Sequence, residues 1–341
     1  MPDRMMTDCD ASTAQVSTRA PEEISRRDLL AWGSLLGLAP FAAFADTYPS
    51  RPINLIVGAP PGGSVDFGAR VLMRPLSEIL GVPVIIDNKP GATGVIGAKF
   101  VAKAPADGYT LLIATPTSVL IGPQTMPADS FNTLRDIVGI NMVAKNPLAI
   151  AINPALKIDN LKDLVALSRT RPVTLGQSGS GGSFDLLIKQ LGKFTGGNFD
   201  SIPYKGMGPA ITDAVGGQID GVASDLGPCL PFHQGGKLKI VAVTSDKRVA
   251  SLPNVPAAVE SYPGLVAYNW LGLFAPAKTP PDIINKINAA LLKILARDDV
   301  KAQFSQSANI VSSMKGPAEF QAFAASEYKR WGAVLKEQGM I

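Results

Sequence analysis

The stretch Ile53–Leu80, INLIVGAPPGGSVDFGARVLMRPLSEIL, decides the fold class of this 341-residue chain. A run of mostly apolar β-formers leads into GAPPGGSVD, and a helical pattern of apolar residues follows it. Strand, glycine-rich turn and helix are the layout of a phosphate-binding loop, but that motif places a lysine after its last glycine. Here Ser64 follows Gly63 directly. The stretch therefore predicts a turn that is ready for an anion and has no cation.

Strand-like and helix-like segments alternate along the rest of the chain. Strand patterns occur at 82–87, 109–115, 148–153, 173–178, 201–204, 219–224 and 237–244, and helix patterns at 94–104, 160–169, 184–196, 208–217, 281–297 and 317–338. Such alternation predicts an α/β protein whose parallel sheets are covered by helices on both faces. So many units favour two sheets, and we expect lobe 1 over 46–147, lobe 2 over 148–268, and a return to lobe 1 over 269–341.

The first 45 residues have the pattern of a signal peptide. Arg26 and Arg27 precede an apolar run from Leu29, and Ala43 and Ala45 form a small-x-small cleavage site. The arginine pair favours twin-arginine export to the periplasm. Ordinary secretion stays open, because Leu29 stands where such signals usually carry Phe. We expect a mature chain that begins at Asp46.

Composition narrows the function classes. The apolar share is 46%, enough for a sizeable core, and the net charge is +4 without a basic, aromatic-interleaved patch, which disfavours nucleic acid as a partner. Cys9 leaves with the signal, so Cys229 stays alone and no internal disulfide is expected. No later stretch reaches the ~18 apolar residues of a membrane span. We expect an exported, soluble monomer that meets anions and needs no cofactor.

The first loop can bind an anion through its backbone. The N–H groups of Gly62, Gly63 and Ser64 open the following helix, where unpaired donors and the helix dipole attract negative charge. Pro61 stiffens the approach, and we expect Asp66 to cap the turn or fix the loop. Gly63→Val is expected to abolish binding, because a β-branched side chain would fill the anion's place and resist the φ and ψ of the turn.

A second stretch repeats this layout. Gly176–Asp185, GQSGSGGSFD, is again strand, small polar loop and helix, and it lies in the second predicted lobe. Two such loops would face each other across a cleft, an arrangement that suits a dicarboxylate. Hydrogen bonds to a charged group contribute roughly 1.5–3 kcal/mol each. Four to six of them would support micromolar binding, which needs about −8 kcal/mol net.

Enzyme interpretations fit the sequence less well. The residues around Ser178 nearly spell the G-x-S-x-G nucleophile elbow, but Ser180 replaces its last glycine, and Ser183 is the other candidate nucleophile. His233, the one histidine, is expected on the surface near a helix end. One His and one Cys cannot assemble a transition-metal cluster, so no metal is expected. We interpret Asp220 and Asp225 as loop-fixing or ligand-contacting rather than acid/base groups.

Five segments carry a family likeness: YPSRPINLIVGAPPGGSVDFGARVL (48–72), GYTLLIATPTS (108–118), IPYKGMGPAITDAVGGQIDG (202–221), GKLKIVAVTSDKR (236–248) and LPNVPAAVES (252–261). In order and spacing over 48–341, they resemble the receptors of tripartite tricarboxylate transporters, the Bug or TctC type of periplasmic solute-binding protein. The resemblance implies a type II periplasmic-binding-protein fold, with two α/β lobes joined by two crossovers around a ligand cleft. It also implies capture of a carboxylated solute by main-chain amides and hydroxyls, and delivery to a two-subunit membrane permease.

Three positions depart from the family pattern. Gly58 and Ala59 stand where the family usually has Pro-Phe, which should widen the pocket. Asp185 replaces a usual His, which would disfavour an extra anionic group and favour an amine or hydroxyl nearby. Ser224 and Asp225 occupy the end of the strand after Gly217, where the family usually has a small acidic pair.

These observations predict a carboxylate receptor whose ligand is a mono- or dicarboxylate, including an amino acid or aromatic acid. A sensor of the same fold and an exported serine hydrolase remain the alternatives. The predicted ligand-binding residues come from both loops, the end of the third strand and the strand after Gly217: Ala59, Pro61, Gly62, Gly63, Ser64, Asp66, Thr115, Ser118, Ser178, Gly181, Gly182, Ser183, Asp185 and Asp225.

Overall fold

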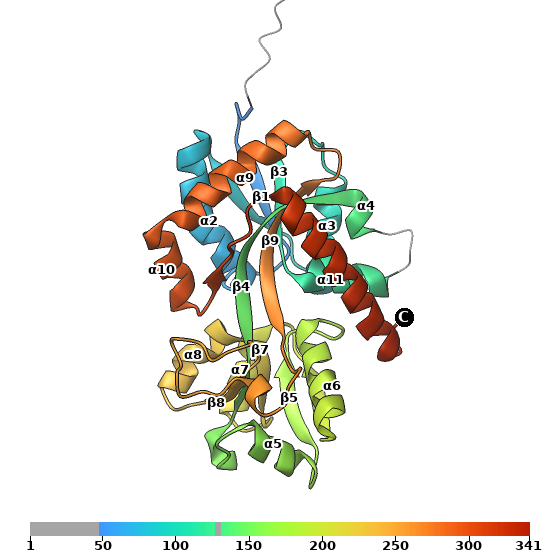
Figure 1. Cartoon of the computed structure of the whole chain (residues 1–341), viewed down its shortest axis with the longest axis vertical. Helices are drawn as coiled ribbons and strands as arrows, with labels where there is room; N and C mark the ends of the chain where they lie inside the picture. Colours follow the sequence, from blue (N-terminus) through green and yellow to red (C-terminus); the bar gives the residue numbers. More distant parts are fainter. Residues whose placement is uncertain (1–47, 127–130) are drawn as a thin grey trace, which may run out of the picture. The chain divides into compact units, whose positions relative to one another are not determined.

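The computed structural model describes residues 48–126 and 131–341 (Figure 1). The predicted signal peptide, 1–45, lies outside the described residues. Ten strands in the described part form one hydrogen-bonded set, in the order β2-β1-β3-β9-β4-β7-β5-β6, with β8 and β10 both paired to β4. The longest strand, β4 (Ile137–Ile152), belongs to both halves of this set.

The first half of the set mixes parallel and antiparallel pairing. β1 pairs in parallel with β2 and β3, whereas β9 runs antiparallel between β3 and the first part of β4. β10 adds a short antiparallel pair to β4. The bounds are β1 (Ile53–Val57), β2 (Val84–Asn88), β3 (Thr110–Ala114), β9 (Tyr268–Pro276) and β10 (Ile310–Val311).

The second half is built around the end of β4. Leu148–Ile152 pairs antiparallel with β7, and most of the same segment also pairs antiparallel with β8. β5 pairs in parallel with β6 and β7. The bounds are β5 (Val173–Gln177), β6 (Phe199–Pro203), β7 (Gly221–Asp225) and β8 (Lys239–Val243).

The expectation of parallel sheets is right for β1–β3 and β5–β7 but wrong for β4, β8, β9 and β10. The first part of β4 gave no clear strand pattern, because it is buried on both faces and therefore lacks alternation, and because Gly139, Asn141 and Pro147 interrupt its apolar residues. β9 escaped prediction for the same reason, since all of its residues except Tyr268 are buried. The lobe boundaries at 147/148 and 268/269 stay a prediction.

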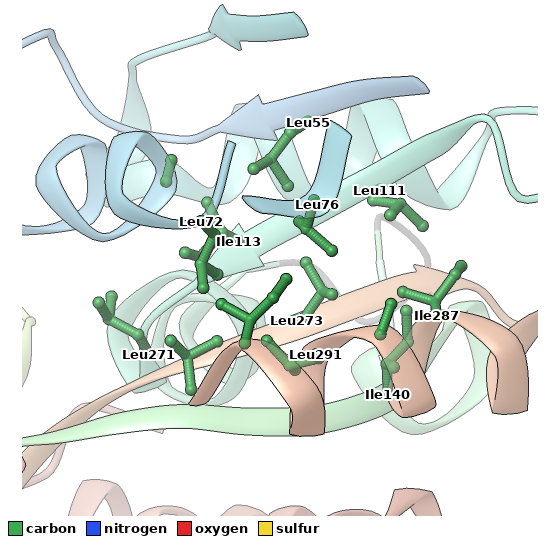
Figure 2. Close-up of a cluster of buried hydrophobic side chains, with 14 of the residues drawn as sticks. Leu55, Leu72, Leu76, Leu111, Ile113, Ile140, Leu271, Leu273, Ile287 and Leu291 are labelled. Atoms are coloured by element: carbon green, nitrogen blue, oxygen red, sulfur yellow. The ribbon is translucent and has the colours of Figure 1, made fainter. Parts of the chain in front are cut away.

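Helices cover both faces of each half, as expected. In β1, Leu55 packs into a core with α2 and α9, whereas Ile56 packs into a second core with α3 and α11. Figure 2 shows the first of these cores, where Leu72, Leu76 and Leu291 meet the strands. These helices are α2 (Ser64–Leu80), α3 (Val95–Ala102), α9 (Pro281–Ala296), α10 (Asp298–Gln306) and α11 (Pro317–Glu337), with the short α4 (Thr133–Asp136) before β4.

The end of β4 shows the same alternation. Ile150 packs with α5 and α6, and Ala149 and Ala151 pack with α7 and α8. The bounds are α5 (Leu161–Ser168), α6 (Ser183–Thr195), α7 (Met207–Val215) and α8 (Leu226–Gln234). A strand that is buried on both sides in this way fixes its register firmly, because a slip of one residue would exchange the two cores.

Local signals placed several helix ends correctly. The Asn160 side chain accepts from the Asp163 N–H, as expected of a cap, and α6 ends at Gly196 in the left-handed conformation. No helix in residues 48–126 or 131–341 is both long and apolar enough to cross a bilayer. The loops of the candidate site follow the carboxyl ends of parallel strands, which is where open α/β sheets bind ligands.

Candidate functional site

The first loop joins β1 to α2 and holds its glycines in defined conformations. Gly62 has φ +86°, in the left-handed region that favours glycine, and its N–H donates to Asp66 Oδ2 at 2.9 Å. Gly63 caps α2 with φ −81° and ψ 172°. Because the first amides of a helix lack a carbonyl partner within it, the N–H groups of Ser64 and Val65 stay available. The loop therefore offers the backbone N–H groups of Ser64 and Val65 as hydrogen-bond donors to a ligand.

The buried side chain of Asp66 holds this loop in place through hydrogen bonds. Its side chain is buried and accepts from Gly62, from Arg70 Nε at 2.7 Å and from Asn88 Nδ2 at 3.1 Å. Burial by itself would raise the pKa of Asp66, but the hydrogen bonds from Arg70, Gly62 and Asn88 outweigh it and hold the pKa below its usual value. Asn88 also donates to the Ala59 carbonyl at 2.9 Å. The carboxylate therefore fixes the loop, the role that the sequence suggested for it.

The second loop, between β5 and α6, copies this geometry. Gly181 has φ +74° and donates its N–H to Asp185 Oδ2 at 2.9 Å, and Gly182 caps α6 with φ −88° and ψ 178°. Lys189 lies 3.1 Å from Asp185, as Arg70 lies beside Asp66. Both loops thus share the pattern G-G-S-x-D-x-x-x-[R/K], in which the acid holds the amide of the first glycine.

The surroundings of the two loops differ. In the second, the Ser183 N–H donates to Thr117 Oγ1 at 3.2 Å, and the two hydroxyls lie 3.2 Å apart. Thr117 belongs to the turn after β3, where Ser118 Oγ donates to the Thr115 carbonyl at 3.0 Å. Gly182 is buried, whereas Gly62 and Gly63 are exposed. The second loop therefore uses the Ser183 amide, the counterpart of the Ser64 amide, in a contact with protein.

Asp225 meets the first loop from the end of β7. The carboxylate accepts from Ser64 Oγ at 2.8 Å and from Asn269 Nδ2 at 3.1 Å, and only 6% of the residue is exposed. Burial raises the pKa of Asp225 to about 6, although both hydrogen bonds act to lower it. We expected Asp220, like Asp225, to fix a loop or contact the ligand. Its carboxylate instead accepts hydrogen bonds from Arg171, at 2.7 Å, and from the Thr174 N–H.

A cavity of about 230 Å³ lies where these groups meet. Among the predicted residues, Gly62, Gly63, Ser64 and Asp225 line it. Sequence reasoning missed the remaining lining residues, which are Phe67, Asn146, Pro147, Leu226, Gly227, Pro228, Ser307, Ala308 and Asn309. Asn146 left no distinctive signal, because it stands between Lys145 and Pro147, where the apolar residues of β4 are interrupted.

The other predicted residues lie elsewhere. Asp185 lines a separate, open depression with Ser180 and Lys189, and the lining of the 230 Å³ cavity does not include Ser178, Gly181, Gly182 or Ser183. Nor does it include Ala59, Pro61, Asp66, Thr115 or Ser118. The structure thus brings four of the predicted residues together at one cavity and uses Asp66 and Asp185 as supports.

One local expectation is wrong. Gly63 is not strained, since its φ and ψ are extended values that β-branched residues readily adopt. A Cβ at Gly63 would find only the Pro60 carbonyl oxygen nearby, at 3.7 Å. The conformation that requires glycine belongs to Gly62.

The one histidine, which a serine hydrolase would need as its base, makes another contact. His233 Nδ1 accepts from the Ile240 N–H at 3.3 Å, and no hydrogen bond within 48–126 and 131–341 joins it to Ser178. Cys229 is buried, and burial raises the pKa of its thiol to about 12. Over the same described residues, no three His, Cys, Asp or Glu side chains gather as a metal site would require.

Comparison with known proteins places this geometry in a family. A family model described as "Tripartite tricarboxylate transporter family receptor" matches residues 68–340. Protein BugT of Bordetella pertussis is 39% identical over 300 residues, which cover 86% of this chain and 91% of BugT.

Solved structures agree with this assignment. The periplasmic binding protein BugD superposes with a TM-score of 0.79 at 30% identity, covering 86% of this chain and 99% of BugD. A Rhodopseudomonas palustris protein with adipate gives 0.78 at 29% identity, covering 86% and 98%. MatC from the same organism, with bound malate, gives 0.76 at 25% identity, covering 84% and 100%.

These neighbours have the two-lobed α/β fold of periplasmic binding proteins, which matches the shared strand β4 and the helix-covered halves described above. The family match, the 39% identity to BugT and the common fold lead to one conclusion: the chain belongs to the tripartite tricarboxylate transporter receptor family of Bug/TctC-type periplasmic binding proteins.

Proposed function

We propose that this protein is a periplasmic receptor that captures a small carboxylate through the backbone of its first loop. The observation that carries the proposal is the junction of Gly63 and Ser64 with Asp225 at one cavity. The free amides at the start of α2 supply donors, and the helix dipole adds positive potential. A single carboxylate needs no lysine there, because it carries one charge and accepts two or more hydrogen bonds.

The relatives support a carboxylate as the ligand class. One neighbouring structure holds malate and another holds adipate. Both molecules are short chains with terminal carboxylates, and a cavity of about 230 Å³ is large enough for a molecule of that size. A mono- or dicarboxylate of a few carbons is the ligand that we propose.

Capture requires the two halves to close on the ligand about the strands that join them. The Ser64–Asp225 contact is a candidate for a bond made in the closed state. Delivery to a two-subunit membrane permease, action as a monomer, and export with cleavage before Asp46 complete the proposal. N-terminal sequencing of the secreted protein tests the cleavage site, and a start many residues from Asp46 would contradict it.

Titration calorimetry tests the capture of a carboxylate. The purified mature protein is titrated with malate, succinate, adipate, L-aspartate and benzoate, and each injection series is checked for turnover of the compound. Micromolar binding without turnover supports a receptor. Turnover of a chromogenic ester that disappears in Ser178→Ala would instead support the hydrolase, and absence of binding to every carboxylate would contradict the proposed function.

A further inference from the structure

The helix α11 is anchored on the first half of the strand set. Its Phe320 and Trp331 side chains are buried in the core that also contains Trp270 of β9. The rings of Phe320 and Trp270 meet edge-on, with 5.6 Å between their centroids. Gln321 Nε2 donates to the Gly139 carbonyl of β4 at 3.0 Å. When the two halves open or close, α11 therefore moves with the first half.

The helix α6 belongs to the second half, but one of its side chains crosses to the first. Leu187 and Ile188 pack into the core around the end of β4. Leu186, by contrast, lies in the same core as Trp331 of α11 and is fully buried there. Movement of the halves apart would expose Leu186 to water, and the hydrophobic effect opposes that exposure.

Two residues at the end of α11 add further contacts between the halves. Glu337 forms an ion pair with Lys193 of α6, so the end of α11 lies beside α6 (Figure 1). Met340 follows, and its Sδ atom lies 3.8 Å from Lys189 Nζ. A Cβ at Gly181 would lie 3.2 Å from Met340 Cε, so this side chain also lies against the second loop. The first half thus contacts both α6 and the loop that precedes it.

These contacts lie outside the candidate binding site. The lining of the 230 Å³ cavity includes none of Leu186, Lys193, Glu337 and Met340. Any effect of these residues on ligand affinity must therefore come through the positions of the two halves.

We infer that Leu186, Lys193, Glu337 and Met340 form a latch that holds the halves together around the bound ligand and raises its affinity without touching it. The inference rests on the proposed function, because it requires that the halves close on a ligand. Contacts that exist only in the closed state stabilise that state alone, and the apparent affinity rises with its population. The four residues are positioning residues.

Reversal of each charge in the ion pair tests the latch. Lys193→Glu and Glu337→Lys each replace an attraction between exposed side chains with a repulsion. We expect each variant to bind the tightest binder among malate, succinate and adipate about 3- to 10-fold more weakly than the wild type. The double variant restores the attraction and should return the affinity to within about 2-fold of the wild type. Titration calorimetry measures the affinities.

The rate constants separate a latch from general damage. Contacts that form after closure slow the escape of the ligand, so the single variants should release the same carboxylate faster and bind it at an unchanged rate. Stopped-flow tryptophan fluorescence measures both rates. Met340→Ala should show the same pattern with a smaller effect. Glu327→Gln is the matched control, because its partner Arg330 belongs to the same helix, and no change is expected. Circular dichroism verifies that each variant is folded.

The outcomes distinguish the inference from the function on which it rests. Folded single variants that bind the carboxylate as tightly as the wild type overturn the latch and leave a carboxylate receptor. A double variant that stays as weak as the single variants also overturns the latch, because the loss then does not come from the ion pair. If the wild type binds none of the three carboxylates, both proposals are wrong.

Discussion

The loops at Gly62–Asp66 and Gly181–Asp185 have one local structure and two different surroundings. In each, a glycine at positive φ donates to an aspartate four residues on, and a second glycine caps the helix. The first loop is open to a cavity and touches Asp225, whereas the second is packed against Thr117. A turn that faces a cavity and a turn that packs against protein can therefore share these short-range features, because the neighbouring elements decide which backbone amides stay free.

Adding a side chain to the capping glycine should have the largest effect on ligand affinity, and the effect should differ between the two loops. We expect Gly63→Val to weaken carboxylate binding about 1000-fold or more, because it blocks two or more hydrogen bonds to a charge. The fold should survive, since the site is extended and open. Titration calorimetry measures the affinity, and circular dichroism monitors the fold.

Gly182→Val is the matched variant. A Cβ there would lie 3.2 Å from Thr117 Cγ2 and 3.5 Å from the Gly179 carbonyl oxygen, so we expect lower stability with affinity changed only a few-fold. Loss of binding in a folded Gly182→Val protein would show that both loops hold the ligand, as the sequence suggested. Normal affinity in Gly63→Val would remove the first loop from the site.

Asp225 gives the contact with the first loop a pH dependence. Its pKa rises from 3.8 to about 6 on folding because of burial, so it favours the folded state most below pH 4. That stability is lost as the pH rises from about 4 to 6, amounting to about 3 kcal/mol. We expect Asp225→Asn to remove this fall and to raise the stability of the unliganded protein at pH 7.5.

Urea unfolding of both proteins between pH 4 and 8 measures the effect. Asp66 contributes with the opposite sign, because its pKa is lowered on folding, so the stability it provides is lost as the pH falls. The difference between the wild type and Asp225→Asn isolates one carboxyl from the other. An equal slope for both proteins would mean that Asp225 does not titrate in this range.

Removing the loop-fixing acids should have a smaller effect. Asp66→Ala deletes the acceptor of Gly62, Arg70 and Asn88, and we expect a loss of about 1–3 kcal/mol together with weaker ligand binding. Asp185→Ala deletes the acceptor of Gly181 and the partner of Lys189 and should cost less. Denaturant melts rank the two variants, and the reverse order would argue against the supporting role of Asp66.

Thr117→Val tests the contact that distinguishes the second loop. The change keeps the volume but removes the acceptor of the Ser183 N–H, and we expect a loss of about 1 kcal/mol. Ligand affinity should stay within a few-fold of the wild type. A large loss of affinity would indicate that the contact stabilises the binding-competent state.

The sequence predicted much of the fold for reasons that lie within a few residues. Apolar periodicity located α9, α11 and the strands β1, β3 and β5, and Asn160 and Gly196 marked helix ends. The same approach missed β9 and the first part of β4, because buried strands lose the alternation that identifies them.

By itself the sequence also determined both glycine turns, the likeness to the receptor family and the position of the acids that follow each turn. Their hydrogen bonds span only four residues and are encoded locally. Only the tertiary structure decided that Ser64 meets Asp225, 161 positions away, and that Asn146 pairs with Asn269. Those contacts depend on the register of β4 and β9 across two cores, and sheet register is a property of the packed molecule rather than of any short segment.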